Sequence, residues 1–256
     1  MALPEASAGA RDAGTEAYFD TWTPEYDAAR LAPAAEWIRR LADGDSTLVD
    51  VGCGSGNVLA YLREATGLRR LSGIDVSPRY LEQARERIGC ETRQGSILDA
   101  GLVDELGGRF DFAVLGAVLH HLVGRTRRAS RERARLALAN AVSLVRPGGH
   151  VIVHEPVFYP PWTMDLVFYT KKVASALTSR RLALFDQWNN LGAPVVSYYT
   201  NEELRRMVAE DPRAELLDLR SVPAYLSSLQ RAAFIHRRED TTGVIRRRDT
   251  PCASSS

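Results

Sequence analysis

Short apolar runs alternate with amphipathic stretches between residues 46 and 155. Between the runs, apolar residues return at helical spacing, as Val58, Leu59 and Leu62 do. Strands that alternate with helices in this way predict a parallel sheet with right-handed crossover connections. The runs with the length of strands are 46–51, 71–76, 90–94, 110–115 and 150–155.

Turn and capping residues place the ends of several helices. Ser77 precedes Pro78, which suits a helix start because serine caps the first N–H groups and proline fits the first turn. Gly67 is expected to end the helix that follows the first strand. Helical spacing also predicts an entry helix around 37–41 and a long helix over 131–145, before a Pro-Gly-Gly turn.

The pattern changes after Pro156. Residues 156–200 show no clear strand, and Thr200 then opens a helix with the residues of a capping box. Segments 214–222 and 231–236 are predicted to be two closing strands. Because the connection between them is short, we expect an antiparallel pair.

Composition bounds the class of protein. The 256 residues fit one large domain, and 45% apolar with 25% charged residues excludes a wholly disordered, collagen-like or disulfide-scaffold chain. A net charge of +1 gives no global field that would recruit nucleic acid or an anionic membrane. Three cysteines without a CxxC pair argue against structural zinc and favour a reducing compartment. With no secretory signal and no 18-residue apolar run, we expect a cytoplasmic protein.

A glycine-rich turn follows the first predicted strand. Gly52, Gly54 and Gly56 let the backbone turn tightly and approach a ligand closely, although a plain strand-to-helix turn is the alternative. Ligands of open α/β sheets bind beyond the carboxyl ends of the strands. Asp75 ends the second strand there and can accept hydrogen bonds from both ribose hydroxyls. The turn and the acid together indicate a cofactor that contains adenosine.

The charge beside the turn separates two cofactor classes. Dinucleotide sites usually have the spacing GxGxxG, whereas this turn has GxGxG. Asp50 stands two residues before the first glycine, where a carboxylate repels phosphate but suits a cationic amino or sulfonium group. This favours S-adenosylmethionine (SAM) and leaves a nucleotide-linked oxidoreductase as the alternative.

Several motifs together resemble those of class I SAM-dependent methyltransferases that act on small molecules. The resemblance covers residues 15–156 and the closing helix and strand pair. It implies an α/β, Rossmann-like, seven-stranded sheet that is mostly parallel with an antiparallel last strand, helices on both faces, and a cap insert after strand five. The matching stretches are Val49-Asp50-Val51-Gly52-Cys53-Gly54-Ser55-Gly56, Gly73-Ile74-Asp75-Val76-Ser77, Gly95-Ser96-Ile97, 110–122 and 144–149.

The same resemblance implies roles for single residues. Asp50 would orient the amino group of SAM, Asp75 would hold its ribose, and Gly116 would offer a carbonyl near the amino group. Ser96 departs from the family pattern, because an acid often stands there beside the adenine. The other residues expected to contact SAM or its product S-adenosylhomocysteine are Tyr18, Tyr26, Gly52, Cys53, Gly54, Gly56, Val76, Ile97 and His121.

We therefore expect one methyltransferase domain over 1–256. Its expected parts are an N-terminal helical lid (15–45), a SAM-binding core (46–156), a substrate cap insert (157–200), a closing helix and strand pair (200–238) and a tail (239–256).

Proton transfer at the acceptor needs a base only if the acceptor must lose a proton. His120, His121, His154 and Glu155 follow the ends of strands four and five and are the candidates for catalysis, each with packing or backbone capping as the alternative role. No arrangement of acids indicates a catalytic magnesium, and the attacking atom stays open between carbon, oxygen and nitrogen.

The insert after strand five is rich in aromatic residues. Nine of the chain's 20 aromatic residues lie in 156–200. Such residues suit a planar or hydrophobic acceptor, as in natural-product biosynthesis, or else they pack the insert or form a homodimer contact. The candidates for acceptor contact are Trp162, Phe168, Trp188 and Tyr198.

Other partners are weighed against this reading. Residues 115–118 replace the Asn-Pro-Pro-Tyr motif typical of enzymes that methylate nucleic-acid bases, so a nucleic-acid substrate is not expected. The arginine-rich run 125–135 either binds phosphate or begins a solvated helix. The apolar segment 164–182 either contacts a membrane surface or forms a lid helix. A SAM-binding regulatory or scaffold protein without catalysis is the alternative outside enzymes.

Overall fold

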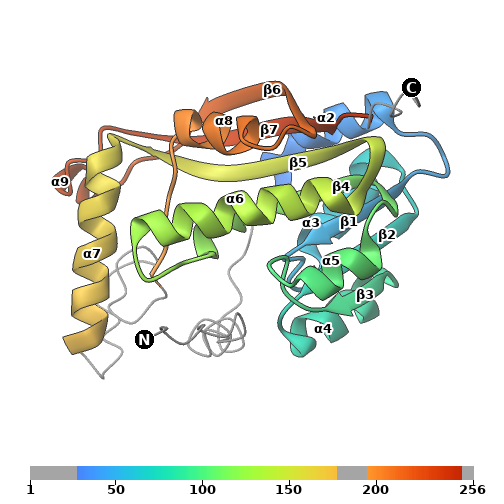
Figure 1. The fold of residues 1–256 in the computed structure, drawn as a ribbon, viewed down its shortest axis with the longest axis horizontal. Coiled ribbons are helices and arrows are strands. Elements are labelled where there is room, and N and C mark those ends of the chain that lie inside the picture. The colour runs from blue at the N-terminus through green and yellow to red at the C-terminus, as the bar shows by residue number, and fades with distance from the viewer. Residues whose placement is uncertain (1–27, 178–194, 250–256) are drawn as a thin grey trace, which may run out of the picture.

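The computed structural model describes residues 28–177 and 195–249. They form a seven-stranded sheet in the order β3-β2-β1-β4-β5-β7-β6, with helices on both faces (Figure 1). Strands β1 to β5 pair in parallel, and β7 runs antiparallel to both β5 and β6. The predicted fold class is therefore confirmed.

The elements follow the predicted alternation. The strands are β1 (Thr47–Val51), β2 (Arg70–Asp75), β3 (Glu91–Gln94), β4 (Phe110–Gly116), β5 (Val145–Tyr159), β6 (Ala214–Pro223) and β7 (Arg237–Arg247). The helices are α2 (Ala32–Leu41), α3 (Asn57–Thr66), α4 (Pro78–Ile88), α5 (Ala100–Leu106), α6 (Arg127–Leu144), α7 (Pro161–Leu177), α8 (Asn201–Ala209) and α9 (Ser228–Ala232), with short 3₁₀ turns η1 (Ala28–Leu31) and η2 (Leu119–His121).

Side-chain alternation along the strands separates two hydrophobic cores. Val49 and Val51 of β1 pack in the core that holds α5, α6 and α8. Leu48 points to the opposite face, where it packs with α2, α3 and α4. Since neighbours along a strand face opposite sides, Asp50 belongs to the α2–α4 face. Both layers bring their helix N-termini or loops to the carboxyl ends of the parallel strands, where the site lies.

Local capping explains where several helices begin. The Ser77 hydroxyl accepts a hydrogen bond from the Tyr80 N–H at the start of α4, as predicted. Thr200 and Glu203 form the predicted capping box, in which each side chain accepts from the other residue's N–H. These bonds satisfy donors that a helix start otherwise leaves unpaired.

The last strand lies later in the chain than predicted. Residues 231–236 end α9 and form the turn after it, and β7 instead occupies Arg237–Arg247. The predicted tail is thus wrong for 239–247, which pair with both β5 and β6. Only the segment 241–245 of β7 is buried, and the charged residues at both ends, Arg237–Asp240 and Arg246–Arg247, concealed the strand. The strand pair is antiparallel, as expected.

Strand β5 also extends past the predicted boundary. It continues through Pro156 to Tyr159, so the insert begins with α7 rather than with an irregular segment. Val157 forms an isolated parallel bridge with Tyr199, which returns the chain to the sheet after the insert. Within the described residues, no helix is long and apolar enough to cross a membrane.

We expect Thr200→Ala to lower the free energy of unfolding by about 1 kcal/mol, because it removes the hydroxyl that accepts the Glu203 N–H. Urea unfolding followed by circular dichroism measures the change. Thr170→Ala is the control, since that exposed hydroxyl bonds only to carbonyls inside α7, and its effect should stay within about 0.5 kcal/mol. Equal losses in the two variants would contradict the capping role.

Candidate functional site

The glycine turn after β1 is held against the end of β2. The N–H groups of Gly52 and Cys53 donate to the Ile74 carbonyl at 2.7 and 3.1 Å. Gly52, Gly54 and Gly56 have φ values of 73°, 51° and 83°, which side chains disfavour. A Cβ at position 52 would lie 2.8 Å from a methyl carbon of Val118, whereas one at position 54 would meet no atom within 4 Å. The turn is thus packed on one side and open at Gly54.

Asp50 is a buried carboxylate beneath this turn. Its residue is 1% exposed, and its Oδ2 atom has no hydrogen-bond partner in the described part of the chain. Burial raises the pKa of Asp50 well above its usual value, and the nearby Asp75 charge raises it further. An unpartnered buried acceptor is costly, so this position is suited to a ligand that brings a cationic donor.

Asp75 lies at the end of β2 and binds the backbone on both sides. Its Oδ2 accepts from the Gly54 N–H and its Oδ1 from the Ser77 N–H, both at 2.9 Å. A carboxylate oxygen accepts more than one hydrogen bond, so these bonds are compatible with ribose hydroxyls. The next residue, Val76, is 40% exposed, which suits an apolar surface against a flat ring.

The loop after β3 lies beside Asp75. The Gly95 N–H donates to the Asp75 carbonyl at 3.0 Å, which brings Ser96 and Ile97 to the same edge. Ile97 is buried, and its carbonyl accepts from the Asn140 side chain at 2.7 Å. The Ser96 hydroxyl accepts from the Leu98 N–H at 3.2 Å, so it shapes the turn.

The segment after β4 joins the glycine turn to β5. Gly116 ends β4 opposite His154, and Ala117 follows with a φ of 59°, unusual for a residue with a side chain. The Ala117 N–H donates to the His154 carbonyl at 2.7 Å, which holds this conformation. Val118 then packs over Gly52. Backbone outliers of this kind concentrate at functional sites.

The structure brings His120 and Glu155 together. Glu155 is 1% exposed, and its Oε2 lies 2.7 Å from Nδ1 of His120. Its Oε1 accepts from the Leu119 N–H at 2.6 Å, so the expected capping role of Glu155 is present as well. Both carboxylate oxygens are therefore engaged at the start of η2.

The other two candidate histidines have different surroundings. Burial and the neighbouring His120 hold the pKa of His121 well below its usual range, so His121 stays neutral at pH 7. His154 is 3% exposed, and its Nδ1 lies 3.0 Å from the Thr242 hydroxyl of β7. Burial lowers the pKa of His154 also. The hydrogen-bond partner of this Nδ1 is therefore a hydroxyl and not a carboxylate.

Among the described aromatic candidates, Tyr198 has a ring contact with His120. Its ring stacks on His120 with centroids 5.2 Å apart and lies 4.4 Å from the Phe158 ring. Phe168 is 1% exposed and serves the packing of α7, whereas Trp162 is 54% exposed beside Phe234. The candidates Tyr18, Tyr26 and Trp188 lie outside the described residues.

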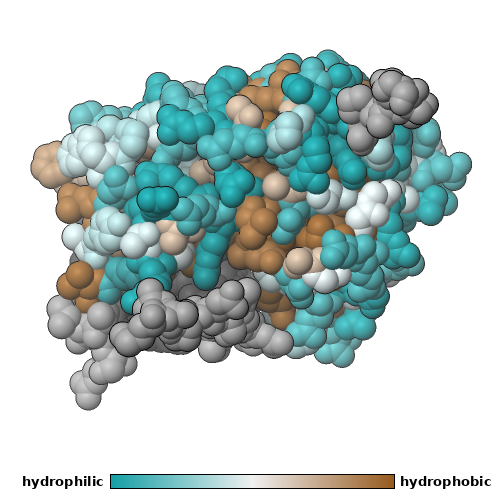
Figure 2. Space-filling model, viewed as in Figure 1, coloured by the Kyte–Doolittle hydropathy of each residue, from teal (hydrophilic) through white to brown (hydrophobic). Residues whose placement is uncertain are grey.

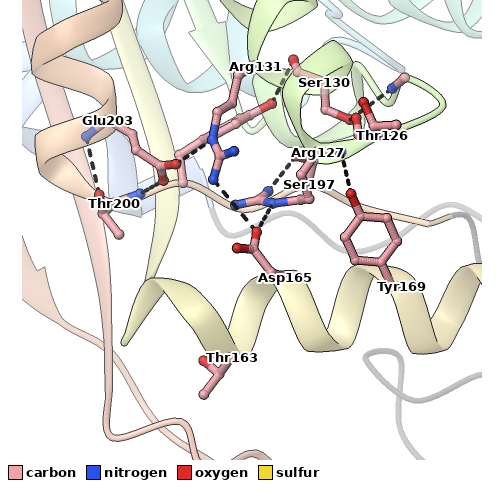
Figure 3. A network of polar contacts seen from close by, with 12 residues as sticks. Thr126, Arg127, Ser130, Arg131, Thr163, Asp165, Tyr169, Ser197, Thr200 and Glu203 are labelled. Carbon is pink, nitrogen blue, oxygen red and sulfur yellow. Dashed lines mark hydrogen bonds and ion pairs between the residues drawn. The ribbon is translucent and has the colours of Figure 1, made fainter.

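Arg127 fixes the insert to the core (Figure 3). Although this residue is only 2% exposed, it donates to Asp165 of α7 at 2.9 Å and to the Ser197 hydroxyl at 2.5 Å. Its guanidinium also lies 5.6 Å from the Tyr199 ring centroid. The Ser197 N–H in turn donates to the His120 carbonyl at 2.8 Å. Arg127 thus connects α7, the chain after the insert and the His120 turn.

The rest of the arginine-rich run is largely paired within the protein. Arg131 donates to Glu203 of α8 at 2.6 Å and lies 3.6 Å from Asp165. Arg128 pairs with Glu132 on the same helix. These partners favour a structural role over a phosphate-binding surface. The run was visible in the sequence, but its role as an anchor for α7 was not.

Helix α7 keeps an apolar outer side. Leu166 is 49% and Val173 is 58% exposed, and Figure 2 shows hydrophobic residues at the edge where Figure 1 places this helix. Its inner side packs through Met164 onto Phe158 and Ile235. The insert is therefore attached to the sheet by packing as well as by Arg127.

Comparison with known proteins agrees with this geometry. Residues 49–151 match the family model of the methyltransferase domain. That match covers the glycine turn, the end of β2 and the turn after β4, and it ends within β5 before His154 and Glu155. Over residues 49–151 this chain is therefore similar to SAM-dependent methyltransferases.

The relatives that match this chain differ in the acceptor that their names give. Trans-aconitate 2-methyltransferase of Enterobacter sp. (strain 638) is 48% identical over 69 residues, which cover 25% of this chain and 27% of that protein. Ribosomal protein L11 methyltransferase of Burkholderia mallei (strain NCTC 10229) is 31% identical over 117 residues, 45% of this chain and 34% of that protein. The chain thus matches only about a third of these relatives' own length.

A solved structure shares the fold over most of both chains. It is the 1,6-didemethyltoxoflavin-N1-methyltransferase of Burkholderia thailandensis, with bound 1,6-didemethyltoxoflavin and S-adenosylhomocysteine. The TM-score is 0.57 at 19% identity, over 97% of this chain and 94% of that one. At this identity the likeness supports the fold alone.

Asp50→Asn is expected to raise the melting temperature of the ligand-free protein at pH 7. Burial raises the folded-state pKa of Asp50 above its unfolded value, so stability falls as pH rises between the two. The variant has no charge to bury, and its advantage should disappear below about pH 4. Melting curves between pH 3.5 and 8 measure this; a variant that is less stable at pH 7 would contradict the argument.

The same substitution should weaken SAM binding by about 10- to 100-fold, because a charge-assisted hydrogen bond is lost. Isothermal titration calorimetry measures the Kd. Asp45→Asn, in the exposed turn before β1, is the control and should bind SAM normally. Unchanged affinity in Asp50→Asn would remove this carboxylate from the cofactor site.

Arg127→Met should lower the free energy of unfolding by about 2 kcal/mol, because two hydrogen bonds of a buried cation are lost while the exposed Asp165 stays solvated. Arg128→Met is the matched control, since its ion pair with Glu132 is exposed and should contribute within about 0.5 kcal/mol. Denaturant unfolding measures both. A loss no larger at Arg127 than at Arg128 would contradict the anchoring role.

Proposed function

We propose that this protein transfers the methyl group of SAM to a small aromatic or otherwise hydrophobic metabolite in natural-product biosynthesis. The observation that supports SAM as the cofactor is the buried, unpartnered Asp50 carboxylate beneath a glycine turn that is open at Gly54. A cationic amino group is attracted by that carboxylate, whereas a pyrophosphate is repelled by it. This disfavours the nucleotide-linked alternative.

The residues at the sheet edge fit the parts of SAM. Asp50 would hold the amino group, with the Gly116 carbonyl as a further acceptor, and Asp75 would hold the ribose. Val76 offers exposed apolar surface to the adenine, beside the loop that carries Ser96 and Ile97. When bound, SAM supplies a methyl group on a positively charged sulfur. The protein contributes chiefly by alignment of the acceptor with that methyl group, since proximity alone removes a large part of such a barrier.

The acceptor half rests on the aromatic group beside β5. Tyr198 stacks on His120 and contacts Phe158, and Arg127 fixes the segment that carries Tyr198. Flat apolar rings of this kind favour a planar or hydrophobic acceptor. Four of the six arginines in 125–135 pair with acids of this chain, which disfavours nucleic acid. The L11-type relative makes a protein acceptor the second candidate.

Transfer from methyl-labelled SAM tests the whole proposal. The purified protein is incubated with an extract of its source cells, and the label is expected in a small-molecule fraction that mass spectrometry can identify. Label in protein or nucleic acid would overturn the acceptor class. Calorimetry with SAM and with NAD runs in parallel: tight NAD binding without SAM binding would support an oxidoreductase, and SAM binding without transfer would support a regulatory protein.

Tyr198→Ala should raise the KM of the identified acceptor about tenfold and leave the Kd of SAM unchanged, because the ring is expected to contact the acceptor only. Trp162→Ala and Trp188→Ala test the same expectation for the insert. Tyr225→Ala, whose ring is 78% exposed at the end of β6, is the control. A normal acceptor KM in all three test variants would count against a substrate-lining insert.

A further inference from the structure

Glu155 fixes which nitrogen of His120 carries the proton. A carboxylate only accepts hydrogen bonds, so Nδ1 of His120 must donate to Oε2 across the 2.7 Å contact. In the neutral imidazole the lone pair then belongs to Nε2. Glu155 pairs with no lysine or arginine among the described residues, and His120 is its ion-pair partner there. A proton taken up at Nε2 would be stabilised by this buried carboxylate.

Three further contacts hold the imidazole in place. Tyr198 stacks on it at an interplanar angle of 25°, and the His121 ring lies 4.0 Å away, centroid to centroid. The Ser197 N–H holds the His120 carbonyl. Among the described residues no hydrogen bond to Nε2 is formed, and this edge is the part of the ring that remains for a ligand. The His–carboxylate arrangement matches that of a general base with its orienting partner.

We propose that His120 is the general base of this enzyme, that Glu155 is its positioning residue, and that the acceptor therefore bears an acidic proton, as the hydroxyl of a phenol or an enol does. The inference rests on the proposed function, because it concerns the acceptor of that same site. A bond forms between the acceptor oxygen and the methyl carbon while the carbon–sulfur bond breaks, and its electron pair stays on sulfur. The hydroxyl proton passes to Nε2 of His120.

The His120–Glu155 pair favours acceptors that must lose a proton over acceptors that have none to lose at pH 7. A carboxylate is already ionised at pH 7, with a pKa near 4, and a thioether has no proton to lose. Neither gains from a base. A phenol ionises near pH 10, so at pH 7 it is a weak nucleophile until its proton is removed. A buried carboxylate that orients a histidine, besides accepting from the Leu119 N–H, is explained by an acceptor that must lose its proton.

The chemistry of the labelled product tests the acceptor class before the acceptor is identified. Product from methyl-labelled SAM and cell extract is treated with mild alkali. A methyl ester, formed from a carboxylate, releases its label as volatile methanol, whereas an ether keeps it. We expect retained label. Volatile label would overturn the inference and leave the proposed methyl transfer intact.

Variants test the base and its positioning residue. His120→Gln should reduce the initial transfer rate by about 10²- to 10⁴-fold at pH 7, and Glu155→Gln by a smaller factor, with the Kd of SAM unchanged in both. His150→Gln is the control, because that histidine stacks on Phe112 at the opposite edge of β4 and β5. The ratio of the transfer rate of the unaltered protein to that of His120→Gln should fall as pH rises from 7 to 10, since the acceptor then ionises without a base. A ratio that does not fall would indicate a structural role and overturn the proposal.

A measurement on the protein alone keeps the test independent of transfer. Nitrogen-15 NMR of histidine-labelled protein should show His120 with the proton on Nδ1 and a bare Nε2, assigned by the loss of its signals in His120→Gln. A proton on Nε2 in the neutral ring would overturn the proposal, whatever the transfer assay shows. Absence of SAM binding in the unaltered protein would instead contradict the proposed function.

Discussion

The site depends on the burial of carboxylates where parallel strands end. Asp50 is enclosed beneath the glycine turn with one oxygen unpartnered, and Glu155 is enclosed beyond β4 with both oxygens engaged. Because it is buried and unpartnered, Asp50 is suited to bind a cationic ligand. Because both of its oxygens are engaged, Glu155 holds the neighbouring His120 ring in a fixed orientation. Two acids of the same chemistry thus acquire different tasks from the hydrogen bonds around them.

The turn after β4 unites these two places. Ala117 adopts a strained backbone conformation, Val118 packs over Gly52, and His120 meets Glu155 within the same short stretch. A shift of this turn would disturb the cofactor side and the acceptor side at once. Arg127 supports this turn through Ser197, whose N–H donates to the His120 carbonyl.

The sequence was informative where local chemistry decides structure. The glycine spacing, the acid after β2 and the caps at Ser77 and Thr200 are short-range signals, and the structure places each as expected. Strand β7 was misplaced because its charged ends are tolerated beside solvent, and only its pairing with β5 and β6 defines it. The His120–Glu155 pair and the Arg127 anchor join residues 35 and 38 or more positions apart, so no local pattern could reveal them.

Strand β5 is a single rigid element that runs from the central sheet through Glu155 to the base of α7. A residue inserted or deleted between Pro156 and Tyr159 would move α7 by about 3.3 Å and reverse the faces of the side chains beyond it. The glycine turn and Asp75 would not be displaced. Changes of length in this stretch would therefore alter the surroundings of the proposed acceptor site and leave the proposed cofactor site in place.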